Sequence, residues 1–491
     1  MDPFPEITAE RTMFREQLVA AGFSDDGTLL YGPVRWQHAT GQWLSTRITV
    51  ELGDAFPYCP PTVMLDARRA SPTDPVPTFH VETNGALCLF DRDVPVEGAC
   101  WRSVPDLLTW IGGWLRRSAD CWPGDTDTDL ERYLESNGRF VVYDGDDLAD
   151  KTGLLELTGS PVVTRVRYKE PTRPRRRKGK RASSRAVFVG RPCGYLLDVG
   201  ELSAPLRSWV DVLDAGGARA VTAQRLIRLG HVSVLLVRYL RGGREGILAL
   251  ACHSRSGVPG GIEIRGCEVS DESRGARELR AGTGSGSLSR YRVAVVGCGA
   301  VGSFTADLLF RAGIRQLTLR DSQILRPGNV VRHLAGDRHI GYMKVDAVRA
   351  RLAELGLPVD LNVTSTEAVT TPRQASELMS EHDLVIDASG DERATALLLW
   401  AAADNGGKLL SVCLQRAGGI ARVDRLPLDE GEQHLPAVPV LPGGELTVRE
   451  RGCGDTVSLT PPHSVVAAAA LATRAAVAVL TSRPVPARDA A

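Results

Sequence analysis

Few aromatic side chains and no excess of either charge characterise this sequence of 491 residues. Phe, Trp and Tyr together make up 5% of it, while 59 basic side chains balance 59 acidic ones. A net charge of zero provides no overall attraction to nucleic acid or to an anionic membrane, so we expect neither as a partner. The apolar share of 43% and the charged share of 24% are typical of a globular protein. At this length we expect about two to four domains.

Paired cysteines and long apolar runs are also missing. Ten cysteines are spread along the chain, and no two form a Cys-x-x-Cys pair, so the spacing predicts neither a structural zinc site nor a thioredoxin-type motif. The first ten residues lack the basic start and apolar core of a signal peptide. The most apolar stretch, residues 465–480, contains Arg474 and is shorter than the roughly 20 residues that span a bilayer. We therefore expect a cytoplasmic protein whose thiols are free.

The sequence pattern divides the chain into three segments, residues 1–140, 141–288 and 289–491. In the first, turn residues and hydrophobic spacing predict an α+β domain with helices at 7–21, 104–117 and 127–134 and strands at 29–36, 43–52 and 62–65. The second is expected to be a small α+β domain with strands at 186–190, 232–239 and 246–252 and a helix at 221–229. It contains a basic segment at 171–181, expected to be a mobile loop, and ends in a Gly/Ser stretch at 281–289 that predicts a flexible linker.

The third segment alternates strands with helices, which predicts a parallel sheet covered by helices on both faces, as in a Rossmann-like fold. Strands are expected at 291–296, 316–319, 383–386 and 408–413, and helices at 303–312, 343–355 and 463–480.

A glycine motif follows the first of these strands. Gly297, Gly299 and Gly302 form G-x-G-x-x-G between a strand and a helix, where the helix amino terminus offers free N–H groups to phosphate oxygens. Asp321 ends the next strand, a position from which an acidic side chain can bind ribose hydroxyls. Alone, the motif would also fit an NAD-dependent oxidoreductase.

Further polar residues follow in order: Asn329-x-x-Arg332, then Gly341-x-x-Lys344, then Asp387-Ala-Ser-Gly-Asp391. With them, residues 285–480 resemble the ThiF-type adenylating family, which includes ubiquitin-activating enzymes. The resemblance implies that ATP and Mg²⁺ bind here. It assigns Asp321 to the ribose, assigns Asn329, Arg332 and Lys344 to the phosphates, and leaves Asp387 and Asp391 as alternative magnesium ligands. Cationic groups of this kind stabilise the charge that develops when a carboxylate attacks the α-phosphate.

The thiol of this third segment is a separate question. Cys453 lies in Arg451-Gly-Cys-Gly-Asp-Thr456, just before the apolar helix expected at 463–480. In the thioester-forming branch of the family, a cysteine in such a loop attacks the acyl adenylate, which would make Cys453 the first acyl acceptor. Cys413 and Cys298 compete for this role, although their positions at a strand end and inside the glycine motif suit packing. Zinc, which many ThiF relatives hold on paired cysteines, is not expected here.

The first segment contains a second set of motifs. Phe56-Pro-Tyr-Cys-Pro-Pro61 is followed by His80-x-x-x-Asn84-Gly85-x-Leu87-Cys88-Leu89 and then by Trp101. Over nearly all of residues 5–140 this order resembles the ubiquitin-conjugating enzymes, in which the cysteine of such a motif carries the acyl group. His80 falls where the family usually has the asparagine of its H-P-N motif. A histidine there can donate a hydrogen bond to the oxyanion or accept the proton of the attacking amine, and Asn84 is a second candidate.

Taken together, the segments resemble the fused activating–conjugating enzymes of bacterial anti-phage operons, notably those that accompany cGAS-like nucleotidyltransferases. The resemblance implies adenylation of a partner's carboxyl terminus, that partner being a ubiquitin-like protein or such a nucleotidyltransferase. Transfer through Cys453 and Cys88 to a lysine or another amine would follow, in a homodimer formed through the adenylating domain. The alternatives are a ThiF-like activator of a sulfur-carrier protein and a non-catalytic adaptor.

Overall fold

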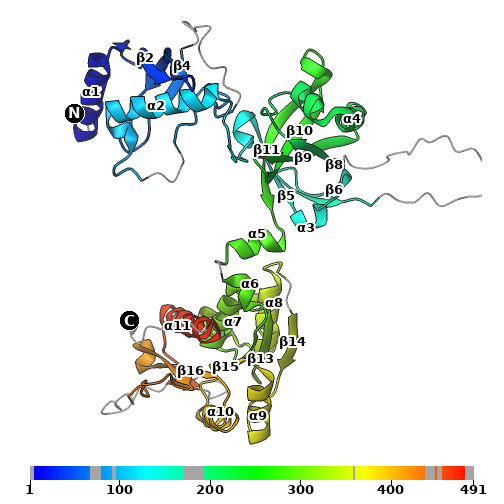
Figure 1. Cartoon of the computed structure of the whole chain (residues 1–491). Helices are drawn as coiled ribbons and strands as arrows, with labels where there is room; N and C mark the ends of the chain where they lie inside the picture. Colours follow the sequence, from blue (N-terminus) through cyan, green and yellow to red (C-terminus); the bar gives the residue numbers. More distant parts are fainter. Residues whose placement is uncertain are drawn as a thin grey trace, which may run out of the picture. The chain divides into compact units, whose positions relative to one another are not determined.

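The computed structural model describes residues 5–66, 79–90, 95–170, 193–282, 284–357, 360–436, 448–449 and 456–481 (Figure 1). The chain divides into two compact units, Met1–Ser273 and Arg274–Ala491. The three-domain division of the sequence stays a prediction. Strand β5 (Ser136–Tyr143), which belongs to the barrel described below, crosses the boundary that was predicted at residue 140.

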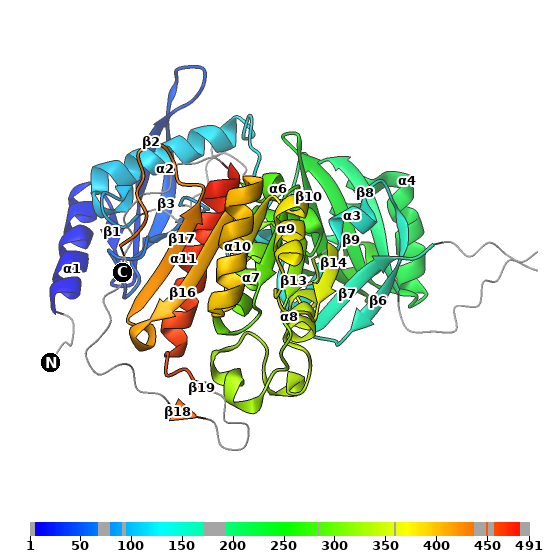
Figure 2. The same cartoon turned by 90° about the horizontal axis from the view of Figure 1, so that it is seen from below.

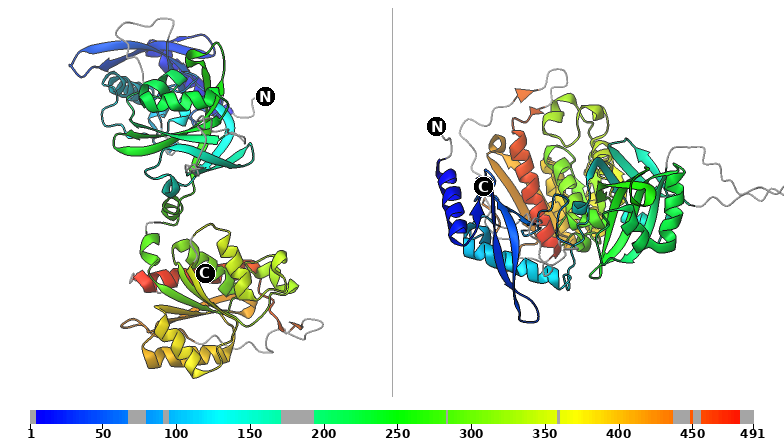
Figure 3. Two further views of the ribbon diagram at one scale, coloured as in Figure 1. Left: turned by 90° about the vertical axis from the view of Figure 1, so that its right-hand side faces the viewer. Right: turned by 90° about the horizontal axis from the view of Figure 1, so that it is seen from above.

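The first unit begins with a small antiparallel sheet between two helices. The sheet has the order β1-β2-β3-β4, with β1 (Ser24–Asp25), β2 (Leu29–Gln37), β3 (Trp43–Glu51) and β4 (Thr62–Leu65). Helix α1 (Pro5–Ala20) precedes the sheet, and α2 (Val104–Ala119) packs against β2 (Figure 3). Alternate residues of β2 are buried, as in a strand with one face on a core. These predicted helices and strands are confirmed.

A closed barrel of seven strands follows, in the order β10-β11-β5-β7-β6-β8-β9. After β5 its strands are β6 (Gly153–Gly159), β7 (Val163–Tyr168), β8 (Cys193–Glu201), β9 (Val232–Arg241), β10 (Arg244–Ser254) and β11 (Ile262–Asp271), with a short helix α3 (Gly145–Leu148). Its interior contains Leu155, Leu196, Val234, Leu236 and Ala249, which are at most 1% exposed. The expected strands at 232–239 and 246–252 are confirmed, and the middle segment contains more strands than the sequence predicted.

Helix α4 (Trp209–Arg228) packs against the barrel, over β8, β9, β10 and β11 (Figure 2). Ser208 begins it with a capping box, in which the hydroxyl of Ser208 and the carboxylate of Asp211 each accept from the other's backbone. The predicted helix at 221–229 is therefore the second half of a longer one. The buried side chains of α4 belong to the same apolar cluster as those of the N-terminal sheet. This cluster also includes Leu130, Tyr133 and Leu134 from the segment between the two.

The second unit is built on a six-stranded sheet in the order β14-β13-β12-β15-β16-β17. All neighbours are parallel except β16 and β17, which are antiparallel. The strands are β12 (Arg292–Val296), β13 (Gln316–Arg320), β14 (Asp360–Ser365), β15 (Leu384–Asp387), β16 (Leu409–Gln415) and β17 (Ile420–Leu426). The order reverses between β12 and β15, and such a switch point opens a ligand crevice at the carboxyl ends of the strands.

Helices cover both faces of this sheet, as predicted (Figure 1). Val293 and Val295 of β12 join the apolar cluster of α7 (Ala300–Ala312), α8 (Lys344–Ala353) and α11 (Pro462–Thr481). Ala294 and Val296, which point the other way, join that of α9 (Pro372–Glu381) and α10 (Glu392–Asn405). The sequence pattern did not predict α9. Helix α11 is long and apolar enough to cross a membrane, but its residues from Val465 to Leu480 include six that are buried in the unit.

Two expectations about connecting segments are wrong. The stretch expected to be a flexible linker contains α6 (Ser285–Leu288), which packs so closely on the second unit that the Cβ of any residue replacing Gly313 would lie 2.3 Å from the carbonyl oxygen of Ser285. The helix expected at 127–134 is only the single turn η3 (Glu131–Tyr133), because Asp125 and Asp127 accept hydrogen bonds from backbone N–H groups two residues on. The strand expected at 186–190 and the basic segment 171–181 lie outside the described residues.

The closed barrel predicts a clear stability difference between two leucines of the first unit. Leu155→Ala removes a fully buried side chain from the interior and is expected to lower the free energy of unfolding by about 2–5 kcal/mol. Leu229→Ala, at a side chain that is 58% exposed, serves as the control and is expected to stay within about 0.5 kcal/mol of the parent chain. Chemical denaturation followed by tryptophan fluorescence measures both, and equal effects would contradict the packed interior.

Candidate functional site

The predicted glycine loop lies at the switch point of the second unit, between β12 and α7. Gly297 has φ +88°, and a Cβ there would lie 2.4 Å from the Cα of Ser389. A Cβ at Gly302 would lie 1.8 Å from the carbonyl oxygen of Gly297. A Cβ at Gly299 would meet only open space. Gly297 and Gly302 are thus required by the loop itself, whereas Gly299 leaves room for a ligand to approach the start of α7.

Asp321 follows β13 and joins the glycine loop to the neighbouring strand. One of its carboxylate oxygens accepts from the Cys298 N–H at 2.8 Å, and the other accepts from the Gln323 N–H at 2.8 Å. The structure therefore places Asp321 at the glycine loop with its carboxylate fixed from two sides, and its contact with a ribose stays a prediction.

His333, which sequence reasoning missed, holds the glycine loop from the other direction. The Ala335 N–H donates to Nδ1 of His333 at 3.0 Å, so Nε2 carries the proton and donates to the carbonyl oxygen of Cys298 at 2.8 Å. Burial lowers the pKa of His333, which keeps the ring neutral in this role. A single histidine beside Arg332 gave no pattern that could have identified it.

Two cations near this loop have no carboxylate partner among the described residues. Nζ of Lys344, a side chain that is 8% exposed, donates to Oε1 of Gln323 at 2.6 Å. Arg332 is half-buried at the end of η5 (Pro327–Arg332) and donates to the carbonyl oxygen of Ser458 at 2.8 Å, and burial lowers the pKa of its guanidinium. Desolvated positive charge without a counter-ion is costly, so these positions suit an anionic ligand.

Asn329 has a structural role in the same turn. Its Oδ1 accepts from the Arg326 N–H at 3.2 Å, within a capping box at the start of η5. The cap fixes the turn that ends in Arg332. A contact between Asn329 and phosphate stays a prediction.

The two candidate magnesium ligands differ in their surroundings. Asp387 is 2% exposed and accepts from the hydroxyls of Ser389, Thr395 and Ser411. Asp391 is exposed at the N-cap of α10, where it accepts from the Arg393 N–H at 2.9 Å. Their loop packs against Gly297. The part of the chain that the structure describes has no cluster of three metal-ligating side chains, but nucleotide-bound magnesium needs only one or two protein carboxylates. Asp391 is the more accessible of the pair.

The cysteines of the second unit are unequal as nucleophiles. Cys298 is fully buried, and burial raises its pKa, which agrees with the packing role expected of it. Cys413 is half-buried on β16, and burial, followed by the charge of Asp424, raises its pKa as well. Cys453 lies outside the described residues.

Cys88 in the first unit is half-buried in a loop fixed by its neighbours. Its N–H donates to the carbonyl oxygen of His80 at 2.9 Å, and Nε1 of Trp110 donates to the carbonyl oxygen of Leu89 at 2.7 Å. Burial raises the pKa of the Cys88 thiol, and the negative charges of Glu82 and Asp127 add to this effect. The guanidinium of Arg132 favours the thiolate and opposes this rise of the pKa only in part.

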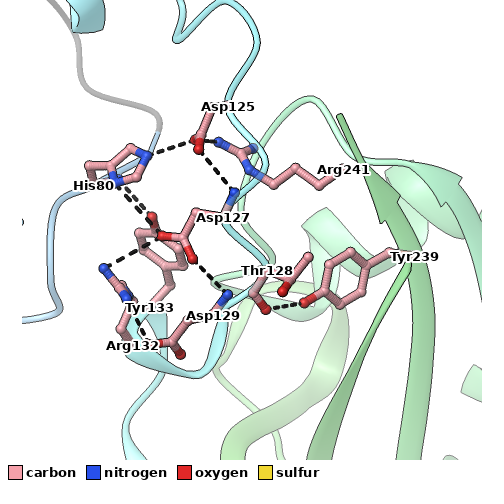
Figure 4. A network of polar contacts seen from close by, with 9 residues as sticks. All are labelled: His80, Asp125, Asp127, Thr128, Asp129, Arg132, Tyr133, Tyr239 and Arg241. Carbon is pink, nitrogen blue, oxygen red and sulfur yellow. Dashed lines mark hydrogen bonds and ion pairs between the residues drawn. The ribbon is translucent and has the colours of Figure 1, made fainter. Parts of the chain in front are cut away.

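The ring of His80 is held between carboxylates (Figure 4). Nε2 lies 2.7 Å from Oδ2 of Asp125, and Nδ1 lies 3.8 Å from Oδ2 of Asp127. The ring also packs against Trp122, with the centroids 4.0 Å apart and the ring planes tilted by 45°. Asn84, the alternative to His80, uses its Oδ1 to accept from the Ala86 N–H at 2.9 Å and so closes its own turn.

Arg132 makes the reactivity of Cys88 testable. Arg132→Met removes the group that favours the thiolate, so the pKa of Cys88 should rise further and alkylation near pH 8 should slow by about threefold or more. Iodoacetamide labelling read at the Cys88 peptide by mass spectrometry measures this. Arg102→Met, which removes an exposed guanidinium paired with Glu10, is the control and should leave the rate unchanged. Faster labelling in Arg132→Met would refute the assigned contact.

Comparison with known proteins identifies the family of a segment of the second unit. The ThiF family model matches residues 276–431. An ATP-dependent ubiquitin transferase-like protein Cap2 of Escherichia coli (strain TW11681) is 33% identical over 115 residues, which are 22% of this chain and 18% of that protein. The molybdopterin-synthase adenylyltransferase of Escherichia coli (strain K12) is 31% identical over 105 residues, 21% of this chain and 41% of that protein.

Among solved structures, the tRNA N6-threonylcarbamoyladenosine dehydratase TcdA of E. coli, in complex with ATP, is 25% identical. The match covers 28% of this chain and 58% of that one, with a TM-score of 0.26. The matched segment spans less than half the length of both curated relatives. Residues 276–431 are therefore a ThiF-family, E1-like domain, and the chain is a distant relative of the Cap2 proteins.

Proposed function

We propose that this chain adenylates the carboxyl terminus of a partner protein with ATP and passes the acyl group through Cys453 and Cys88 to an amine. The observation that carries the first step is the set of groups at the switch point of the ThiF domain. A glycine loop open at Gly299 and a carboxylate at Asp321 suit a ribose and a chain of phosphates. So do Lys344 and Arg332, which have no carboxylate partner in the described part of the chain.

Adenylation would proceed by attack of a carboxylate oxygen of the partner on the α-phosphorus of ATP. The new O–P bond forms as the bond to pyrophosphate breaks, which leaves an acyl adenylate. Lys344 and Arg332 would stabilise the charge on the phosphate oxygens. Asp391, or Asp387 after its hydroxyl donors rearrange, would hold Mg²⁺, which neutralises phosphate charge when it is bound.

Three acyl transfers would follow, each with a defined leaving group. The Cys453 thiolate attacks the adenylate and AMP leaves; the Cys88 thiolate then attacks that thioester and the Cys453 thiolate leaves. An amine finally attacks the thioester on Cys88, an amide forms, and the Cys88 thiolate leaves. Arg132 beside the sulfur favours that leaving thiolate.

His80 has two possible tasks in the last step, and its contacts favour one. A carboxylate only accepts, so Nε2 carries the proton toward Asp125 and is not free to donate to an oxyanion. In the neutral ring, Nδ1 is then the nitrogen without a proton, and it can accept the proton of the attacking amine with Asp127 beside it. We therefore assign His80 to the proton rather than to the oxyanion.

The partner and setting follow from the resemblance and from the Cap2 relatives. We propose a ubiquitin-like protein or a cGAS-like nucleotidyltransferase as the activated partner, a cytoplasmic location, a role in bacterial anti-phage defence, and a homodimer formed through the adenylating domain. The N-terminal segment acts in this proposal as a ubiquitin-conjugating-like domain, for which the order of α1, β1–β4, Cys88 and α2 is the support.

A second candidate is activation of a sulfur-carrier protein, which the likeness to the molybdopterin-synthase adenylyltransferase favours. That activity needs the ATP site but not Cys88. The two candidates therefore give opposite results for a Cys88 variant.

The nucleotide site can be tested with ATP alone. Lys344→Met removes an unpaired cation from the proposed phosphate site and is expected to weaken ATP binding about tenfold or more, as measured by isothermal titration calorimetry. Lys408→Met, which removes an exposed amine that donates to the carbonyl oxygen of Val479, is the control and should bind as the parent does. Equal affinity in the parent and Lys344→Met would remove Lys344 from the nucleotide site.

The acyl relay can be tested with the proteins encoded beside this chain. After incubation with ATP and these proteins, non-reducing gels should show reducible adducts. Cys453→Ala is expected to abolish all of them, because the first acceptor is lost, while Cys88→Ala should retain one. If both variants keep the full pattern the relay is wrong, and if Cys88→Ala changes neither adducts nor product, the sulfur-carrier candidate is favoured.

A further inference from the structure

The loop between α2 and β5 has a strict alternation of aspartates, Asp125-Thr-Asp127-Thr-Asp129. The first two carboxylates accept from the backbone two residues on: the Asp127 N–H donates to Asp125 at 3.0 Å, and the Asp129 N–H donates to Asp127 at 2.9 Å. Arg132 pairs with Asp129 at 2.7 Å and with Asp127 at 3.6 Å. The loop is therefore a stiff series of turns whose carboxylates and guanidinium gather beside Cys88.

His80 is fixed to this loop at three points. Its ring is held by Asp125 and lies near Asp127, and its backbone N–H donates to the hydroxyl of Tyr133 at 2.6 Å. His80 has φ +61°, a conformation that costs energy for a residue with a side chain and so depends on these contacts. Burial raises the pKa of Tyr133 to about 12, so that phenol stays neutral.

The barrel contributes the remaining contacts, from the hairpin of β9 and β10 (Figure 4). Arg241, whose side chain is 6% exposed, forms an ion pair with the same Asp125 oxygen that faces His80, and its guanidinium carbon lies 3.3 Å from the ring centre of Phe79. The hydroxyl of Tyr239 donates to the carbonyl oxygen of Thr128 at 2.5 Å.

The next residue of the hairpin confirms how closely the two parts approach. A Cβ at Gly242 would lie 2.6 Å from the carbonyl oxygen of Asp125. The backbone of the hairpin and that of the aspartate loop are thus in direct contact, and the position of one determines the position of the other.

We propose that Arg241 is a positioning residue for the discharge of Cys88, acting through Asp125 on His80. This inference rests on the proposed acyl transfer at Cys88 and gives the barrel a part in it. The barrel holds the aspartate loop, and the loop holds the His80–Asp127 pair where an amine reaches the thioester. As the amine nitrogen bonds to the carbonyl carbon, the C–S bond breaks, Cys88 leaves as thiolate, and the His80–Asp127 pair takes the amine proton.

Charge explains why Arg241 suits this task. The loop brings three carboxylates together, and Arg132 neutralises only those of Asp127 and Asp129. Without Arg241, the half-buried carboxylate of Asp125 would have only His80 as its side-chain partner. Burial would raise the pKa of the Asp125 carboxyl, but hydrogen bonds from the Asp127 N–H, His80 and Arg241 outweigh it and lower the pKa. Asp125 therefore stays an acceptor, and Nε2 of His80 keeps its proton.

The role of Arg241 can be tested with a chemically supplied acyl group, which needs neither the ATP site nor the natural partner. The full chain with Cys59→Ser, Cys121→Ser and Cys453→Ala, which lacks the two thiols that are exposed among the described residues and the proposed first acceptor, is incubated with a glycine-ending peptide thioester of mercaptoethanesulfonate. Discharge of the acyl group from the Cys88 peptide is then followed by mass spectrometry with either lysine or hydroxylamine. Lysine must lose a proton to attack, whereas hydroxylamine is small, neutral and strongly nucleophilic.

Arg241→Met is expected to slow discharge to lysine about tenfold, because a misplaced acceptor group costs rate, and to change discharge to hydroxylamine less than about twofold. Arg241→Lys keeps the charge and should recover most of the lysine rate. Should Arg241→Met fail to fold, Tyr239→Phe, which removes only the hydroxyl bond to Thr128, is expected to slow lysine discharge about threefold.

The matched control is Arg238→Met on the same strand. The side chain of Arg238 is 13% exposed and pairs with Asp198 at 2.9 Å, and its other hydrogen bonds in the described part of the chain go to the carbonyl oxygens of Leu148 and Lys151 rather than to the aspartate loop. Its loss should leave both discharge rates unchanged. The inference is overturned if Arg241→Met leaves the lysine rate as it was, if it slows hydroxylamine equally, or if Arg238→Met has the same effect. A parent chain whose Cys88 takes no acyl group would instead overturn the proposed acyl transfer.

Discussion

Close backbone approach at the carboxyl end of β12 is the constraint on which the second unit depends. The glycine loop leaves no space for a Cβ at Gly302 or Gly297, and it brings the turn around Ser389 against the start of α7. His333 and Asp321 then hold the loop from opposite sides through the two backbone groups of Cys298. Lys344 and Arg332 lie near this loop without a carboxylate partner among the residues that the structure describes.

The first unit depends on a different kind of constraint, a carboxylate shared between two partners. Asp125 accepts from His80 on the Cys88 side and from Arg241 on the barrel side, in surroundings that bury all three. Removing Asp125 or Arg241 would leave an uncompensated charge, which is more costly than never having buried the pair. One apolar cluster contains residues of the N-terminal sheet, of α4 and of the loop between α2 and β5, among them Leu130 and Tyr133. The loop that contains Asp125 is therefore also held by apolar packing.

The sequence allowed the parallel sheet to be predicted, because buried strands such as β12 and β15 are continuous apolar runs next to helices with a different period. The barrel could not be predicted, because strands such as β7 (VTRVRY) mix charged with apolar residues and β11 pairs with β5 from far along the chain. The ThiF region was expected at 285–480, and the family model matches 276–431. In the candidate sites, motif residues could be named, whereas His333, Arg132 and Arg241 have no sequence pattern. The role of Asp125 within its alternating segment is recognised only from what it contacts.

The contact between Gly242 and Asp125 has a consequence for how such proteins can be assembled from parts. A segment that ended at α2 or at Leu134 would have its cysteine and its motifs but would lack the guanidinium and the hairpin backbone that hold its loop. Exchange of this segment between relatives, whether by recombination or by design, would therefore have to carry the barrel with it. The N-terminal segment and the barrel would therefore be inherited together, and the boundary at which the chain divides into compact units lies after Ser273.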